Sequence, residues 1–101
     1  MNTSTLAPPA EGQTHGSAPE LTIYRVAELK GQWLDAYRGG CRQFDLGDVV
    51  EIDSAGLQLL AALRRLGQEQ DDPVELLHAP PCVEALALEM NVAWLRAAAA
   101  A

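Results

Sequence analysis

The chain has 101 residues, which is enough for one domain with its own hydrophobic core. Hydrophobic residues make up 49% and aromatic residues 5%, so the core is expected to consist of aliphatic side chains. Seven Lys and Arg against fourteen Asp and Glu give a net charge of −7. That charge argues against nucleic-acid binding and against attachment to an anionic membrane, and it is compatible with a protein partner that carries a basic patch.

Several kinds of site and targeting signal have no counterpart in the sequence. Cys41 and Cys82 lack the spacing of a disulfide framework or a zinc site, which favours free thiols in a reducing compartment. No apolar run reaches the length of a membrane span, and no signal peptide is visible. A cytoplasmic location without direct membrane insertion is therefore expected. No phosphate-binding glycine loop is present, and we expect no cofactor.

The first third of the chain predicts a tail, a strand and a helix. Residues 1–18 are rich in Pro, Thr, Ser and Gly without a hydrophobic period, which is typical of a flexible tail. Residues 21–24, LTIY, favour a strand. Residues 25–37 predict an amphipathic helix that Gly39 and Gly40 end. Its apolar side chains recur at three- and four-residue steps: Val26, Leu29, Trp33 and Tyr37.

The middle of the chain predicts two extended segments and a second helix. Residues 42–46 read as a strand, the following Gly-Asp pair as a turn or bulge, and residues 49–52 as resumed extended structure. Asp53 and Ser54 are both good N-cap residues for a helix that runs to about Leu66. Gly67 and the charged residues after it are expected to end this helix.

The last third predicts one more strand and one more helix. Residues 74–78 form the strand, residues 82–90 the helix, and Asn91 its end. Trp94 and Leu95 are expected to pack back on the domain, and the alanines of 97–101 to fray. Strands alternate with helices, which indicates an α/β fold: a mixed sheet of about four strands with helices packed against it.

The motif that ends the second extended segment resembles the STAS domain of the anti-sigma-factor-antagonist type. Within residues 45–57 an Asp-Leu pair, a β-branched run and Asp-Ser-Ala-Gly-Leu follow at the family's spacing. The resemblance covers about residues 20–95, so the STAS domain is expected over 19–96. It is similar above all to short stand-alone members associated with chemosensory clusters.

The resemblance implies a non-catalytic switch. In the family, the hydroxyl that follows the aspartate is phosphorylated by a partner kinase that is also an anti-sigma factor, and the unphosphorylated form binds that partner. By this match Ser54 is the phosphorylation site, Asp53 the preceding aspartate and Gly56 the following glycine. Asp45 matches the aspartate at the end of the previous strand. The chain departs from the pattern at Ala55, which leaves one hydroxyl, and the family's first strand is expected before residue 21.

The helix that begins at Ser54 carries a face expected to be exposed, formed by Gln58, Ala61, Ala62 and Arg65. Together with the acidic loop before it, this face is the expected partner surface. The plain alternatives are that the face is merely solvated and that Ser54 serves only as a helix cap. The expected partner-binding residues are therefore Asp45, Asp53, Ser54, Ala55, Gly56, Gln58, Ala61, Ala62 and Arg65.

Enzymatic alternatives lack their motifs. The carboxylates of Asp45, Asp48, Glu51 and Asp53 lack the spacing of a calcium loop, and we expect no metal. Neither His15 nor His78 has a cysteine or carboxylate partner at catalytic or metal-binding spacing, so no role is expected for either. Ser54 is outside a nucleophile elbow, and no activating pair is legible, so no catalytic residues are expected.

Two functions from the same family stay open. The leading hypothesis is a phosphorylation-controlled signalling module whose partner is an anti-sigma factor with serine kinase activity or a chemosensory protein. The alternative is a regulatory STAS subunit of a lipid-transporting ABC ATPase, a subgroup that also carries a small residue after the serine and need not be phosphorylated.

Overall fold

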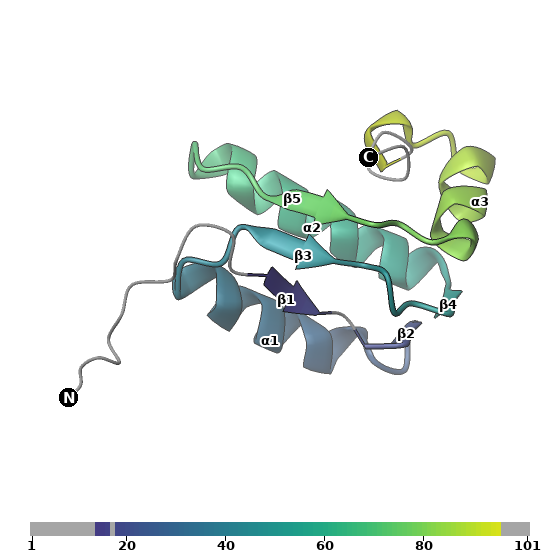
Figure 1. Ribbon diagram of the computed structural model, residues 1–101, viewed down its shortest axis with the longest axis horizontal. Coiled ribbons are helices and arrows are strands. Elements are labelled where there is room, and N and C mark those ends of the chain that lie inside the picture. The colour runs from purple at the N-terminus through teal and green to yellow at the C-terminus, as the bar shows by residue number, and fades with distance from the viewer. Residues whose placement is uncertain (1–13, 17, 96–101) are drawn as a thin grey trace.

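The structure, a computed structural model, describes residues 14–16 and 18–95. Its order of elements is strand, strand, helix, strand, strand, helix, strand, helix (Figure 1). The strands are β1 (Thr14–Gly16), β2 (Glu20–Leu21), β3 (Gln43–Asp45), β4 (Glu51–Ile52) and β5 (Glu75–Leu77). The helices are α1 (Val26–Arg38), α2 (Ser54–Glu69) and α3 (Pro81–Glu89).

The strands form two small parallel sheets that follow one another along the same chain segments. One sheet has the order β1-β3-β5, and the other pairs β2 with β4. The α/β prediction is confirmed, but the expectation of about four strands in a mixed sheet is wrong in detail. All the pairings that the structure describes are parallel, because each connection between paired strands carries a helix back across the sheet.

A bulge separates β3 from β4. Thr14 pairs with Gln43, 29 residues on, whereas Glu20 pairs with Glu51, 31 residues on. The β3–β4 segment thus holds two more residues than the β1–β2 segment. The predicted turn at Gly47 accommodates them, since its N–H donates to the Asp45 carboxylate at 2.8 Å.

Two predictions about the first strands are corrected. Thr14–Gly16, expected in a flexible tail, form β1 at the edge of the sheet, where the His15 ring lies edge-on to Phe44. Residues 1–13 and residue 17 of the predicted tail lie outside the part that the structure describes. The predicted strand over 21–24 ends at Leu21, because the Thr22 carbonyl accepts hydrogen bonds from the N–H groups of Arg25 and Val26 and closes a turn.

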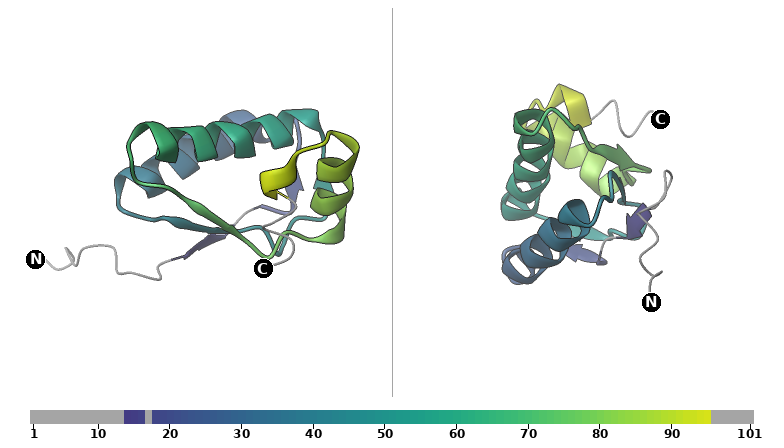
Figure 2. Two further views of the ribbon diagram at one scale, coloured as in Figure 1. Left: turned by 90° about the horizontal axis from the view of Figure 1, so that it is seen from above. Right: turned by 90° about the vertical axis from the view of Figure 1, so that its left-hand side faces the viewer.

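Helices α1 and α2 lie side by side over one face of the sheets, and α3 stands at the end where β4 lies (Figure 2). Their apolar faces meet the strands in one core, whose largest fully buried side chains are Trp33, Phe44, Leu21, Leu29, Leu46, Leu60, Leu95 and Val83. The predicted aliphatic core is confirmed, with one Trp and one Phe at its centre. In the described part, no helix is both long and apolar enough to span a membrane.

The ends of α1 and α3 confirm the predictions, and the end of α2 corrects one. Helix α1 ends with Gly39 as its C-cap, and Asn91 follows α3 in the left-handed region. Helix α2 continues past Gly67 to Glu69. Gly67 is buried, and a Cβ there would lie 2.9 Å from the Val74 nitrogen, so this glycine permits close packing and does not end the helix. Residues 97–101 lie outside the described part.

Candidate protein-interaction site

The cap of α2 is Asp53. Its backbone is extended, and its Oδ1 accepts a hydrogen bond from the Gly56 N–H at 3.1 Å, while its carbonyl accepts the first helical bond from Leu57. One first-turn N–H that the helix itself cannot satisfy is thereby satisfied. The sequence allowed either Asp53 or Ser54 as the cap, and the structure selects the aspartate.

The same carboxylate also holds a distant turn. Oδ2 of Asp53 accepts a hydrogen bond from the Ile23 N–H at 3.0 Å, and the Asp53 N–H donates to the Leu21 carbonyl at 3.1 Å. The Ile23 N–H, followed by the Gly56 N–H, holds the pKa of Asp53 below its usual value. The carboxylate therefore stays charged and joins α2 to the turn between β2 and α1.

Ser54 is the first residue of α2, and its side chain is exposed. Because Asp53 supplies the cap, the Ser54 hydroxyl accepts no first-turn N–H. Within residues 14–16 and 18–95 it has no hydrogen-bond partner. Ser54 is thus not the cap of α2, and it lies exposed beside the residue that is.

Gly56 is placed for packing. It is buried where α2 meets β2, and a Cβ built on it would lie 2.0 Å from the Leu21 carbonyl oxygen. Only a residue without a side chain fits, so the glycine brings the start of α2 close to the sheet. Ala55 beside it is half-buried. Of the predicted partner-binding residues, Gly56 thus lies beneath the surface.

The rest of the predicted face lies together on the outside of α2. Gln58, Ala62 and Arg65 are exposed, and Ala61 is half-buried. With Ser54 they follow the four- and three-residue spacing of one helical stripe. The stripe runs from Ser54, at the start of the helix, to Arg65, a distance of about 16 Å at 1.5 Å per residue.

The Asp45 carboxylate contacts other groups than the Asp53 carboxylate does. Its Oδ1 accepts the Gly47 N–H and lies 3.3 Å from Nδ1 of His78, which follows β5. No hydrogen bond joins Asp45 to Asp53 or Ser54 within the described chain. Parallel pairing of β3 with β5 brings the ends of these strands together and places His78 beside Asp45, a contact that the sequence does not reveal. His78 is 67% exposed and lies on the surface.

The surroundings of Ser54 are acidic and partly apolar. Glu20 and Glu51 are direct partners in the β2–β4 pair, so two like charges lie beside the start of α2, with Arg25 4.0 Å from the Glu20 carboxylate. In the turn that Asp53 holds, Ile23 is 61% exposed and Tyr24 89% exposed. The β-prone composition of residues 21–24 predicts a strand, so the sequence did not identify Ile23 and Tyr24 as an exposed apolar pair.

No metal centre accompanies these residues: among the residues described, no three of His, Cys, Asp and Glu are grouped so as to hold an ion. Acidic charge, exposed apolar area and a free hydroxyl gathered at one helix end are features of a surface that another protein contacts.

Comparison with known families gives one match. The family model described as "Mlab, STAS domain" matches residues 18–97, which include all the described strands and helices except β1. Searches among curated proteins and among solved structures gave no match.

Proposed function

This chain belongs to the STAS domain family, and we propose that it is a cytoplasmic signalling module that binds a protein partner under control of phosphorylation at Ser54. STAS domains are regulatory modules that generally perform no catalysis and typically bind proteins. The observation that carries the proposal is the free hydroxyl of Ser54. It is exposed at the start of α2, and it does not cap the helix because Asp53 does.

The position of Ser54 suits a phosphate. First-turn N–H groups and the positive end of the helix dipole favour negative charge at this point, so modification would leave the domain folded. A phosphate would add about −1.5 to −2 charge at neutral pH. The neighbouring Asp53, Glu51 and Glu20 already carry negative charge, and the modified loop would repel a partner that fits the unmodified one.

The proposed partner surface consists of the Ser54 stripe of α2 and the turn beside it. Its acidic end requires a basic or N–H-lined pocket on the partner. Ile23 and Tyr24 add exposed apolar area of the kind that anchors interfaces, and Asp53 fixes their position relative to Ser54. Loss of binding on phosphorylation would correspond to a coupling of about 1–3 kcal/mol.

The experiment requires a serine kinase of the anti-sigma-factor type, to be sought among the genes that neighbour the one for this chain. Incubation with this kinase and ATP should add a single phosphate, which mass spectrometry should locate on Ser54. The Ser54→Ala chain should take up none and should bind the kinase as wild type does, whereas Ser54→Asp should bind more weakly. Equal affinities of all three chains for the kinase would contradict the proposal.

A second candidate is a regulatory subunit of a lipid-transporting ABC ATPase. The family model that matches, described under the name Mlab, favours it. Ala55, a small residue after the serine, is also in keeping with it. Copurification with an ABC ATPase encoded beside the gene, with no phosphate on Ser54, would establish this candidate over the first.

A further inference from the structure

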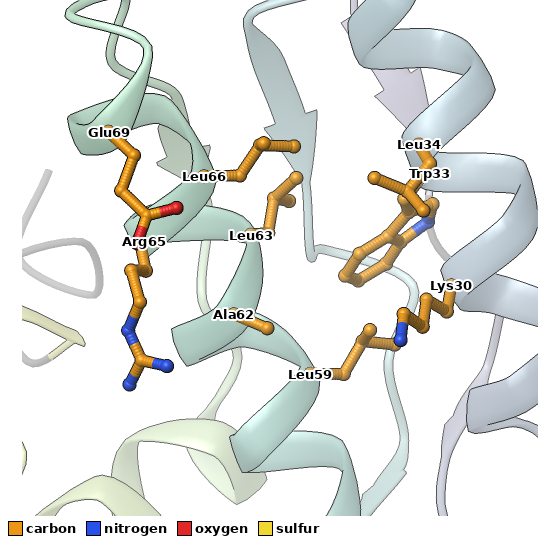
Figure 3. Close-up of a pocket in the computed structure, with 9 residues that line it drawn as sticks. All are labelled: Lys30, Trp33, Leu34, Leu59, Ala62, Leu63, Arg65, Leu66 and Glu69. Carbon is orange, nitrogen blue, oxygen red and sulfur yellow. The ribbon is translucent and has the colours of Figure 1, made fainter.

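A groove runs between α1 and α2 on the face opposite the sheets (Figure 3). Its volume is about 230 Å³. Its walls are apolar and come from both helices: Trp33, Leu34, Leu59, Leu63 and Leu66. Its rim carries Lys30, Ala62, Arg65 and Glu69, and all four are exposed. Trp33, at 1% exposure, belongs to the core below, so the groove has a rigid floor.

The groove adjoins the proposed partner surface. Ala62 and Arg65 belong both to the stripe that starts at Ser54 and to the rim of the groove. Figure 3 shows Lys30 extending from α1 toward Leu59 of α2, so the two helices share one opening. A partner that covers the stripe therefore reaches the groove without leaving the helix.

The charge of the rim is opposite to that of the Ser54 end. The chain carries seven Lys and Arg against fourteen Asp and Glu. Two of these scarce cations, Lys30 and Arg65, stand at the groove, and neither has an ion pair in the part of the chain that the structure describes. Glu69 lies at the rim as well, so the rim has a net charge of +1 in a molecule of net charge −7.

The size of the groove indicates its occupant. Small-molecule sites usually have volumes of roughly 300–1,000 Å³, and this groove is smaller. Interfaces between proteins are commonly anchored by one large apolar side chain in such a pocket. We propose that the groove receives a large apolar side chain of the protein partner, and that acidic residues on either side of it contact Lys30, between the helices, and Arg65, on the outer side of α2.

This inference rests on the proposed function and adds the second half of the docking surface. The partner is then bipolar: basic where it meets Ser54, and apolar with carboxylates where it meets the groove. Such a charge pattern admits one orientation of the partner along α2, because the reverse orientation would place like charges together at both ends.

The test measures the affinity of the full chain for a candidate partner, a serine kinase or an ABC ATPase sought among the neighbouring genes and chosen because it binds wild type. Ala62→Phe fills the groove from an exposed position and should weaken binding by about tenfold or more. Ala85→Phe makes the same change at an exposed position of α3 and should have no effect. Circular dichroism of both variants establishes that they are folded.

The charge of the rim is tested in the same assay. Arg65→Glu and Lys30→Glu should each weaken binding by about tenfold at low salt, and by less at high salt. Arg38→Glu, in the last turn of α1 and outside the groove, is the matched control and should bind nearly as wild type does.

The outcomes separate the two proposals. If Ser54→Asp loses binding while Ala62→Phe and Arg65→Glu bind as wild type does, the groove inference is overturned and the proposed function stands. If the groove variants lose binding and Ser54→Asp does not, the docking surface stands and control by phosphorylation is overturned. If neither neighbour binds the wild-type chain, both proposals are overturned.

Discussion

Oδ2 of Asp53 lies 3.0 Å from the backbone nitrogen of Ile23, a residue 30 positions earlier in the chain. With Oδ1 on the Gly56 N–H, one carboxylate connects the first turn of α2 to the turn that exposes Ile23 and Tyr24. The geometry of the candidate site thus depends on one charged side chain, and the first prediction follows from its titration.

Protonation of Asp53 should weaken the domain at low pH. The Ile23 N–H holds the pKa of Asp53 below its usual value of 3.8 in the folded chain. A carboxyl group with a lowered pKa contributes stability above its unfolded pKa, and this contribution disappears as the pH falls through the folded pKa. We therefore expect the free energy of unfolding to fall from about pH 5 downward, more steeply in wild type than in Asp53→Asn.

Urea denaturation of both chains at about pH 7, 5, 4 and 3 provides the measurement. Asp72, whose pKa is also lowered, by Arg42, is present in both chains and cancels in the comparison. Parallel pH curves for the two chains would show that the Asp53 carboxylate makes no special contribution.

Ser54→Ala should leave stability nearly unchanged. Because Asp53 is the cap, removal of the Ser54 hydroxyl leaves no backbone donor unsatisfied, and the change in the free energy of unfolding should stay within about 0.5 kcal/mol. A serine that acts as the cap would cost about 1 kcal/mol on the same substitution. Chemical denaturation at pH 7 distinguishes the two values, with Asp53→Ala as the variant expected to lose clearly more.

Gly56→Ala should destabilise the domain. The added Cβ would lie 2.0 Å from the Leu21 carbonyl oxygen, so α2 must move away from β2, and we expect a loss of about 2–3 kcal/mol. Gly31→Ala is the matched control, since a Cβ there meets nothing within 4 Å and the helix gains about 0.5–1 kcal/mol. Thermal unfolding of the two variants should show shifts in opposite directions; shifts of the same sign would contradict the close packing at Gly56.

Glu51→Gln should stabilise the domain slightly. Glu51 is the register partner of Glu20 in the β2–β4 pair, and Arg25, 4.0 Å from the Glu20 carboxylate, offsets part of the repulsion between them, so its relief should add only roughly 0.2–0.5 kcal/mol, with a smaller gain at high salt. Glu75→Gln is the control, because Glu75 faces Gln43 and accepts its amide N–H at 3.1 Å. The same change in Glu51 should weaken partner binding if the partner surface there is basic. A stability gain that is insensitive to salt would argue against charge repulsion.

The order of helices and strands could be predicted because hydrophobic spacing and stop signals agree locally. Helix α1 shows this clearly, since its buried Leu29, Trp33 and Tyr37 are also the residues that the spacing identifies, and Gly39 ends it. Asn91 ends the last helix for a similarly local reason, a left-handed backbone that asparagine tolerates.

The limits of β1, β2 and α2 were less predictable, because contacts with distant parts of the chain determine them. Thr14–Gly16 has weak strand propensity and becomes β1 because β3 offers a free edge. Ile23 and Tyr24 have strong strand propensity and lie in a turn, because Asp53 binds the Ile23 N–H that a neighbouring strand would need. Gly67 lies within α2 because of a contact with Val74, which comes later in the chain.

The candidate site was predictable in its residues and only partly in its geometry. Asp53 and Ser54 are adjacent, and both are good caps, so the sequence cannot say which oxygen is used and which stays free. Asp45 comes eight residues before Asp53, yet its carboxylate contacts His78, which belongs to another strand end. The groove between α1 and α2 depends on how two helices pack, and helical spacing within either one does not reveal it.

Glycine contacts at both ends of α2 have a consequence for how a signal at Ser54 would act. Gly56 holds the first turn against Leu21, and Gly67 holds the last turn against Val74, so the helix is anchored to the sheet at two points. A helix anchored in this way resists tilting and sliding, and we expect the backbone amides of α2 to exchange their hydrogens slowly. A charge added at Ser54 then changes the potential on an unaltered shape, and the partner senses it directly, with no movement relayed through the domain.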